Sequence, residues 1–254
     1  MITARQAFAM NYNIHISEEF GFIFFNNPKA GCSTTKATLN LACARRLGVP
    51  LEMRRMHDVH DREHNLLKTP RQVGRANFER MVADPGVVRF CVLREPVSRI
   101  ASAFASKFRR NSPQQQKLNA FLKLPVRRRW SDINEFVQVV ASEPEVRDFD
   151  PHWRLQSRNV FAGQVDLSLV GFQEELEASL RRFSARVFGT ADIEIFDTRT
   201  HFPKNLTNSA VLKPLLTPQS LDLLASAYAE DFALYRQEWA RMHDASPETP
   251  ALAL

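Results

Sequence analysis

Cysteines and long apolar runs are both scarce in this chain. Only three of its 254 residues are cysteines, Cys32, Cys43 and Cys91, and none of them forms a CxxC pair. An odd number without paired spacing indicates neither a disulfide framework nor a zinc motif. No apolar stretch approaches the roughly 18 to 20 residues that span a bilayer, and the N-terminus MITARQAFAMNYN lacks the apolar core of a signal peptide. We therefore expect a cytoplasmic protein with reduced cysteines.

The composition favours one soluble domain with an anionic partner. Hydrophobic residues make up 44% of the chain, which is enough to build a core, and the length suits one large domain. We expect a single domain over residues 1–254, with 1–18 and 245–254 at its periphery. The formal charge of +6 at pH 7 favours a nucleotide, an acidic sugar, nucleic acid or lipid headgroups as the partner. Charge alone does not choose among these.

Short apolar runs followed by helical patterns recur three times and predict an α/β fold class with a mostly parallel sheet. In the first helix we expect Leu39, Cys43 and Leu47 to share the buried face. The strands are predicted at Gly21–Phe25, Val87–Leu93 and Leu167–Gly171, and the helices that follow them at Thr34–Leu47, Val97–Phe108 and Glu174–Phe188.

The other segments carry weaker signals. Glu52–Arg80 is polar and basic, which predicts loops with short helical pieces. Arg109–Trp130 is predicted to be an exposed excursion, because it is polar and carries several arginines. A short helix is expected at Ile133–Ala141. Thr217 followed by Pro218 is typical of a helix start, so we expect the last helix from there to Trp239.

The segment NPKAGCSTTK, Asn27–Lys36, joins the first strand to its helix and predicts an anion site. A strand that feeds a helix through a tight loop leaves backbone N–H groups pointing over the helix N-terminus. Gly31 lets the backbone approach a ligand closely, and Lys29 adds a positive charge. Further donors are the hydroxyl groups of Ser33, Thr34 and Thr35.

The second junction predicts another anion contact. Arg94 follows the strand Val87–Leu93, and ligands of open parallel sheets bind at the carboxyl ends of strands. Its guanidinium can hold a phosphate with two hydrogen bonds, and Ser102 in the next helix can add a donor. The alternative is that Arg94 pairs with the adjacent Glu95 and that Ser102 is merely solvated. Together with the first loop, the functional interpretation is favoured.

Two other functions fit parts of the pattern. A nucleotide kinase loop of the type GxxxxGK[ST] needs a second glycine before its lysine, and Gly31 is instead followed by Cys32 and Ser33. A nucleic-acid-binding protein would use the basic surface. Neither alternative function explains the residues at both strand-to-helix junctions.

The junction motifs resemble those of sulfotransferases that use 3′-phosphoadenosine 5′-phosphosulfate (PAPS), in particular the carbohydrate sulfotransferase group. NPKAGCSTTK is similar to the 5′-phosphosulfate loop PKxACTxxK. FCVLREPVSRIASAFASKF, Phe90–Phe108, resembles the 3′-phosphate motif REPxxRxxSxYxxKF. DPHWRLQ is similar to the HWxPQ segment, LVGFQEELEASL to the IGxxExLxxDL strand and helix, and the end of the chain to YxxDF. The residues named for DPHWRLQ are Asp150, His152, Trp153 and Gln156, and those that match YxxDF are Tyr228, Asp231 and Phe232.

The resemblance implies a three-layer P-loop-like fold, a bacterial-type soluble enzyme and a set of donor contacts. Arg94 and Ser102 would hold the 3′-phosphate, and Lys29 would also act in catalysis by stabilising developing charge. Arg99 and Lys107 either support that pocket or are charges on the helix surface. The scheme requires no metal. The implied contacts of the 5′-phosphosulfate are Lys29, Ala30, Gly31, Cys32, Ser33, Thr34 and Thr35.

The resemblance also implies a histidine base, from the region after the first helix. MHDVHDREHN contains three histidines there, and His60 in VHD resembles the family most closely. His57, His64 and His152 are the rival bases. Their spacings of three and four would put His57, His60 and His64 on one helical face, which is also an arrangement that binds metal, but no carboxylates or second cluster support a metal site.

The chain departs from the family pattern at several positions. Thr35 replaces a tryptophan and Leu155 a proline, and the cysteines that follow HWxPQ in Golgi members are missing. The expected acceptor is a carbohydrate or another small hydroxylated compound. A run of arginines either attracts an anionic acceptor or is only a solvated face of the protein: Arg109, Arg110, Arg127, Arg128 and Arg129. Nucleic acid is not expected as a partner, and peripheral membrane contact is compatible with the charge.

Overall fold

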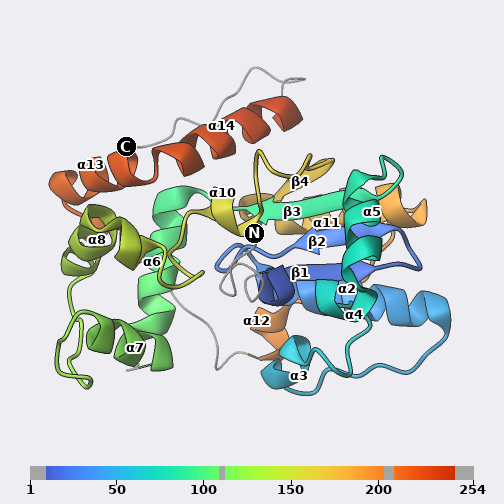
Figure 1. Cartoon of the computed structure of the whole chain (residues 1–254), viewed down its shortest axis with the longest axis horizontal. Coiled ribbons are helices and arrows are strands. Elements are labelled where there is room, and N and C mark those ends of the chain that lie inside the picture. Colours follow the sequence, from blue (N-terminus) through green and yellow to red (C-terminus); the bar gives the residue numbers. More distant parts are fainter. Residues whose placement is uncertain (1–9, 109–111, 203–208, 244–254) are drawn as a thin grey trace. The chain divides into compact units, whose positions relative to one another are not determined.

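A computed structural model describes residues 10–108, 112–202 and 209–243 (Figure 1). The expectations for residues 1–9 and 245–254, and for Arg109 and Arg110, lie outside the described residues. The chain divides into two compact units. Unit 1 comprises the described residues of Met1–Leu93 and Asn159–Leu206, and unit 2 those of Arg94–Arg158 and Thr207–Leu254. None of the helices in the described ranges is long and apolar enough to cross a bilayer.

Unit 1 is built on a sheet of four strands in the order β1-β2-β3-β4 (Figure 1). The strand β2 (Phe22–Phe25) is parallel to β3 (Val88–Leu93), which is parallel to β4 (Leu169–Phe172). The strand β1 (Ile14–Ser17) runs antiparallel to β2. The α/β class with a central, mostly parallel sheet flanked by helices is therefore confirmed, and the three predicted strands begin or end within two residues of the observed ones.

The strand β1 corrects the expectation that residues 1–18 are peripheral. All four of its residues are buried, and Ile14 is paired with Phe25 across the sheet. The segment IHIS is short and half polar, so its own sequence gave no strand signal. His15 of this strand is buried because the strand pairs with β2 and because a side chain from a later loop packs against it.

One face of the sheet packs against two helices, α2 (Cys32–Leu47) and α11 (Leu176–Phe188). Phe22 and Phe24 of β2 and Phe90 of β3 point to this face because side chains alternate along a strand. They meet Leu39 and Cys43 from α2 and residues of α11. Leu47 was expected on the same buried face but is 43% exposed, because it lies in the last turn of α2, where Arg45 and Arg46 are exposed as well.

Shorter elements complete unit 1. The predicted helical pieces after α2 are α3 (Met56–His60), α4 (Pro70–Val73) and α5 (Arg75–Ala83). A 3₁₀ turn, Gln173–Glu175, precedes α11. The short helix α12 (Thr198–His201) lies against α2.

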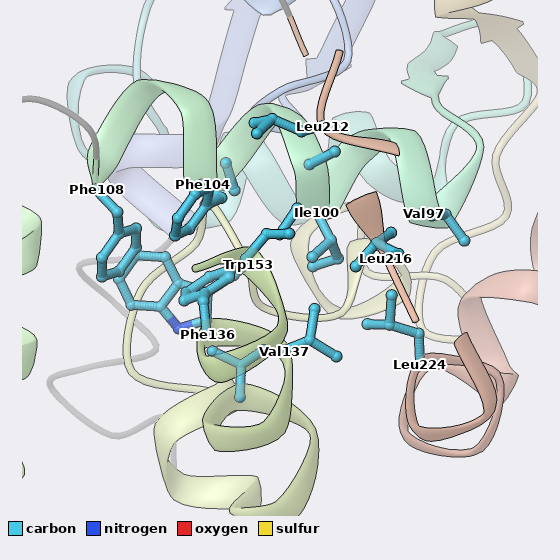
Figure 2. Packing of buried hydrophobic residues seen from close by; sticks show 14 of the residues in the cluster. Val97, Ile100, Phe104, Phe108, Phe136, Val137, Trp153, Leu212, Leu216 and Leu224 are labelled. Atoms are coloured by element: carbon cyan, nitrogen blue, oxygen red, sulfur yellow. The ribbon is translucent and has the colours of Figure 1, made fainter. Parts of the chain in front are cut away.

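Unit 2 is helical. Its elements are α6 (Pro96–Lys107), α7 (Pro113–Phe121), α8 (Ile133–Ser142), α9 (Pro144–Arg147), the start of α10 (Gln156–Asn159), a 3₁₀ turn (Lys213–Leu215), α13 (Pro218–Ala227) and α14 (Ala229–His243). The predicted helix 97–108 and the helix from Ile133 are confirmed. In the core, Val97, Ile100 and Phe104 of α6 are buried as predicted. Figure 2 shows the Trp153 ring beside Phe108 and Phe136. Its centroid lies 5.5 Å from that of Phe108 and 5.9 Å from that of Phe136.

Two expectations for unit 2 were wrong. The excursion Arg109–Trp130 is not simply exposed, because it contains α7 and because Trp130 is buried, with its Nε1 donating to Asn119 Oδ1 at 2.7 Å. The last helix is two helices, α13 and α14. The break falls at Tyr228, whose ring turns into the core and whose hydroxyl donates to the carbonyl of Trp153 at 2.7 Å.

Candidate functional site

The loop between β2 and α2 is held against the neighbouring strand. Asn26 and Asn27 at its start are buried. The Nδ2 group of Asn27 donates to the carbonyl of Val92 in β3 at 3.1 Å, so the loop is fixed beside the carboxyl end of β3. Arg94, the expected phosphate contact of the second junction, comes two residues after Val92 in the chain.

Two residues of this loop have left-handed backbone conformations. Lys29 has φ 74° and Gly31 has φ 72°. A lysine rarely adopts such a φ, and residues held in it are found preferentially at functional sites. A Cβ added to Gly31 would lie 2.7 Å from Cδ2 of Leu176 in α11. The backbone conformation at position 31 therefore favours glycine, and a larger residue would also require the Leu176 side chain to shift.

The start of α2 offers backbone donors to an anion. The helix begins at Cys32, and its N-cap is Gly31, which has no side chain to accept hydrogen bonds from the first turn. The residues Cys32–Thr35 carry no carboxylate. The N–H groups of a first helical turn lack helical partners and lie at the positive end of the helix dipole, so this end of α2 favours an anion.

The threonine hydroxyls of the loop have partners inside the protein. Thr34 Oγ1 lies 3.0 Å from Thr198 Oγ1 and accepts a hydrogen bond from Thr198 N at 3.3 Å. Thr35 Oγ1 donates to the carbonyl of Gly31 at 3.2 Å. The Thr34 contacts attach α12 to α2, and the Thr35 contact fixes the turn at Gly31. Both hydroxyls thus help to hold the loop in shape, and Ser33 is the more exposed hydroxyl of the three.

Lys36, one turn into α2, contacts the histidine that the sequence favours as a base. Its Nζ lies 2.6 Å from Nδ1 of His60, the last residue of α3. Lys36 is only 6% exposed, whereas His60 is exposed. Burial lowers the pKa of Lys36, the nearby Cys32 opposes this shift, and the charge of Arg62 adds to it. A buried lysine with a lowered pKa gives up its proton more readily than one in water.

A second histidine and an arginine lie next to this pair. His15 in β1 is buried, and Arg62 Nη1 lies 3.0 Å from its Nε2. Arg62 Nη2 also donates to the carbonyl of Ile14 at 2.6 Å. Burial lowers the pKa of His15 well below its usual value, and the charges of Arg62, Lys36 and His60 act in the same direction. Burial also lowers the pKa of Arg62, to about 10.

The other two histidines of MHDVHDREHN are not part of this group. The helix α3 ends at His60, so the expectation that His57, His60 and His64 share one helical face is wrong. His64 lies in the following turn, where its Nδ1 is 2.7 Å from Oδ2 of Asp61. Within residues 10–108, 112–202 and 209–243, no three His, Cys, Asp or Glu side chains are grouped so that they could hold a metal ion.

In unit 2, the backbone of Arg94 is bound by Gln156. The Nε2 group of Gln156 donates to the carbonyl of Arg94 at 2.9 Å, and its Oε1 accepts from Arg94 N at 3.2 Å. The Nη2 group of Arg94 reaches Ser209 Oγ at 3.4 Å. The adjacent Glu95 caps α6, accepting from Val97 N and Ser98 N at 2.8 Å each.

The residue Gln156 is in turn held by Asp231 of α14. The carboxylate of Asp231 accepts hydrogen bonds from Gln156 N at 2.8 Å and from Ser157 N at 3.0 Å. Burial raises the pKa of Asp231, and the charge of Arg99 opposes the shift. The family-like residues Gln156 and Asp231 thus form a support for the backbone of Arg94.

Arg99 is not a charge on the helix surface, which was one of its two expected roles. It is 1% exposed, and its guanidinium donates to the carbonyls of Arg154 at 2.7 Å and Pro151 at 3.0 Å. Burial lowers its pKa, and the charge of Asp231 opposes this. Arg99 therefore fixes the segment that leads into Gln156. Ser102, one turn further along α6, is 4% exposed, so the alternative of a merely solvated serine is also wrong.

His152, the remaining rival base, is paired with a carboxylate. Its Nδ1 lies 2.6 Å from Asp150 Oδ1, which also accepts from His152 N at 2.9 Å. Burial raises the pKa of Asp150, but the hydrogen bonds and charge of His152 outweigh it, so that the net shift is downward. The pair belongs to unit 2, whereas His60 belongs to unit 1.

The contacts of Lys36, His15 and Arg62 were not predicted. One signal was present for Lys36. It precedes Leu39 by three residues and Cys43 by seven, which puts a lysine on the buried face of α2. His15 and Arg62 are 47 residues apart in the chain, and nothing in either local sequence indicates that they meet.

Comparison with known proteins agrees with these motifs. A family model described as the sulfotransferase family matches residues 12–236, which include both junctions, α3 and the Gln156 and Asp231 segments. Searches of curated proteins and of solved structures gave no match to the chain. Because the matched region covers most of its length, the chain belongs to the sulfotransferase family.

Proposed function

We propose that this sulfotransferase moves the sulfuryl group of PAPS to a hydroxyl group of a carbohydrate or another small acceptor, with His60 as the base. The observation that carries the proposal is the loop before α2, where Lys29 and Gly31 have left-handed φ angles of 74° and 72° at the start of the helix. A loop held in this conformation at a helix N-terminus suits the binding of an anionic group.

The residues of this loop fit the 5′-phosphosulfate. In the proposed role, the N–H groups at the start of α2 and the side chain of Lys29 bind its oxygens. The buried hydroxyls of Thr34 and Thr35 support the loop, and Ser33 offers its hydroxyl as a further donor. Ala30 and Cys32 would contribute through their backbone.

Arg94 and Ser102 are the proposed contacts of the 3′-phosphate. The support for Arg94 is its bound backbone, because Gln156 holds both its N–H and its carbonyl. A fixed backbone lowers the cost of ordering a guanidinium around a phosphate. Ser102 follows eight residues later in α6, in a buried position. Selectivity for a nucleotide with a 3′-phosphate is the consequence that we expect.

The residues proposed for catalysis have separate tasks. PAPS supplies an activated sulfuryl group and a bisphosphate leaving group. Lys29 and the N–H groups of α2 stabilise negative charge that grows as the leaving group departs. His60 takes the proton of the acceptor hydroxyl, for which its exposed position is suited. No metal is needed for these tasks.

We also propose that residues 1–254 act as one sulfotransferase domain. The family match runs without interruption from 12 to 236, and this range includes residues of both compact units. The acceptor's identity and the cytoplasmic location stay predictions from the sequence.

A screen of acceptors with two labelled donors tests the proposed function. The protein is incubated with hydroxylated sugars and small alcohols, once with PAPS labelled at sulfur and once with ATP labelled at the γ-phosphate, with and without magnesium. We expect label to pass to an acceptor from PAPS without magnesium, and to pass more slowly after Lys29→Ala but not after Lys68→Ala. Lys68 pairs with Glu18 at the surface and serves as the control. Transfer from ATP instead would indicate a kinase and would contradict the proposal.

A further inference from the structure

The hydrogen bond between Lys36 and His60 restricts what His60 can do. The Nζ and Nδ1 atoms are 2.6 Å apart. Only one proton fits between two nitrogens at this distance, so a charged lysine and a charged imidazole would direct hydrogen atoms at each other. The protonation states of the two side chains are therefore linked.

Two arrangements with neutral His60 are possible, and they differ in function. If Lys36 is an ammonium group, it donates to Nδ1, and the imidazole carries its proton on Nε2. Because Nε2 then carries a hydrogen atom, it cannot act as a base. If Lys36 is a neutral amine, it accepts from Nδ1–H, because an amine accepts a hydrogen bond better than it donates one. The Nε2 atom then has a lone pair and is able to act as a base.

We propose that Lys36 is a positioning residue for His60. Lys36 takes up the Nδ1 proton of His60 when His60 removes the proton of the acceptor hydroxyl. This inference rests on the proposed function of the same site. The O–H bond of the acceptor breaks, and its proton binds Nε2 of His60. The Nδ1–H bond breaks, and that proton binds Nζ of Lys36. The acceptor loses one proton and the pair gains one, so that the pair ends with an ammonium group beside a neutral imidazole.

The surroundings of Lys36 favour a neutral amine. The side chain lies on the buried face of α2 and is 6% exposed. Among the described residues, the groups whose charges act on Lys36 or share its surroundings include Cys32 from α2, Arg62 from the loop after α3, and His15 from β1. Arg62 adds positive charge, and His15 is held neutral by its burial. Burial lowers the pKa of Lys36 in this setting.

Asp58 and Asp61, two carboxylates near His60 in the chain, form hydrogen bonds with other groups. Asp58 Oδ2 accepts from the backbone N–H groups of Arg54 and Arg55, at 2.9 Å each. Asp61 Oδ1 accepts from Glu63 N at 2.9 Å, and its Oδ2 lies 2.7 Å from His64 Nδ1. Lys36 contacts Nδ1 of His60, the position at which a carboxylate often holds a catalytic histidine.

Two substitutions distinguish this role from a structural one. Lys36→Arg keeps the charge and the hydrogen bond but cannot lose its proton, because a guanidinium stays charged. Lys36→Met keeps the length and the buried stem but removes the charge and the bond. A structural or anion-binding lysine is better replaced by arginine. A lysine that must be neutral is better replaced by methionine.

The test uses the full-length protein labelled with ¹⁵N in its histidines, with His60 identified by loss of its signals in His60→Gln. In the wild type we expect Nδ1 of neutral His60 to change from unprotonated to protonated as the pH rises and Lys36 loses its proton. In Lys36→Arg, Nδ1 should stay unprotonated throughout. Lys36→Met should lose the pH-linked change, and Lys68→Met should keep it. A pH-linked change in Lys36→Arg would overturn the proposal.

Turnover with the best acceptor from the labelled-donor screen gives a second readout. We expect Lys36→Arg to lower the rate by about 100-fold or more, the scale of general-base catalysis, and Lys36→Met to lower it less. A rate in Lys36→Arg equal to or above that of Lys36→Met would contradict the inference. Failure of PAPS to donate its sulfuryl group in the wild type would refute the proposed function, and the histidine signals would still decide the role of Lys36.

Discussion

The side-chain amide of Gln156 is paired with the backbone of Arg94, donating to its carbonyl at 2.9 Å and accepting from its N–H at 3.2 Å. The amide occupies both hydrogen-bonding groups of Arg94 at the point where β3 has ended. Asp231 binds the backbone of Gln156 in turn. The position of the proposed 3′-phosphate contact thus depends on residues that are 62 and 137 positions later in the chain.

Gln156→Ala should weaken binding of the 3′-phosphate in particular. Loss of two hydrogen bonds to the Arg94 backbone, each worth about 1 kcal/mol, corresponds to roughly a tenfold or greater loss of affinity for 3′-phosphoadenosine 5′-phosphate. Binding of adenosine 5′-phosphate, which lacks the 3′-phosphate, should change little. Calorimetric titration of both nucleotides measures the difference. The matched control is Gln138→Ala, on an exposed position of α8, and an equal loss for both nucleotides would argue against the assignment of Arg94.

Arg99→Met should destabilise unit 2. The change leaves the carbonyls of Arg154 and Pro151 without their donor and removes the positive charge near the buried Asp231. Removal of one member of a buried charged pair typically costs about 3 to 5 kcal/mol in the free energy of unfolding. Urea denaturation followed by circular dichroism checks this. Arg129→Met replaces an exposed arginine and should change the unfolding free energy by less than about 0.5 kcal/mol. Similar values for the two variants would show that Arg99 is not structural.

Gly31→Ala should damage the loop more than the same change at the other end of α2. Both Gly31 and Gly48 have a left-handed φ, of 72° and 66°. An added Cβ meets Leu176 at 2.7 Å at position 31 but nothing within 4 Å at position 48. Gly48→Ala should therefore cost about 1 kcal/mol for the backbone conformation alone, and Gly31→Ala about 0.5 to 1.5 kcal/mol more, because the Leu176 side chain must change its conformation. Thermal unfolding compares the two, and equal costs would mean that the contact with Leu176 does not restrict position 31.

Acid should destabilise unit 1 through His15. Its pKa in the folded protein lies well below the usual 6.5 because of burial. As the pH falls through 6.5, the unfolded chain binds a proton that the folded chain does not, so the free energy of unfolding decreases, by up to about 1.4 kcal/mol per pH unit. Above pH 6.5 both states are neutral and the contribution is constant.

Urea denaturation between pH 7.5 and pH 5 measures this dependence. His15→Gln should reduce the slope, and His57→Gln, which replaces an exposed histidine of α3, should leave it unchanged. A slope that is the same in the wild type and in His15→Gln would contradict the role given to His15.

The elements that the sequence predicted are those with a strong local signal. The strands β2 and β3 are nearly continuous apolar runs, and α6 begins with Pro96 and repeats buried residues at helical spacing. The strand β1 and the break at Tyr228 were not predicted, because each depends on a distant partner. Phe25 and its neighbours in β2 pair with β1, and the carbonyl of Trp153 receives the Tyr228 hydroxyl.

In the candidate site, too, the features with a local sequence signal were predicted, and those that depend on distant residues were not. The motifs indicated the loop at Gly31 and the arginine at the end of β3, because residue types at fixed spacing carry that information. The hydroxyls of Thr34 and Thr35 were expected to face an anion, but both are bonded inside unit 1. Lys36 is the last residue of the motif NPKAGCSTTK, and no role was predicted for it. Its contact with His60 spans 24 residues and depends on how the segment after α2 folds back.

Binding of 3′-phosphoadenosine 5′-phosphate is the most direct measurement of the central claim, that this sulfotransferase takes its sulfuryl group from PAPS. At about 100 times its dissociation constant, a ligand adds about 2.7 kcal/mol to the stability of the folded state. We predict a rise in melting temperature without magnesium, reduced in Lys29→Ala and Arg94→Ala. No rise, or an equal rise with ATP and magnesium, would contradict the claim.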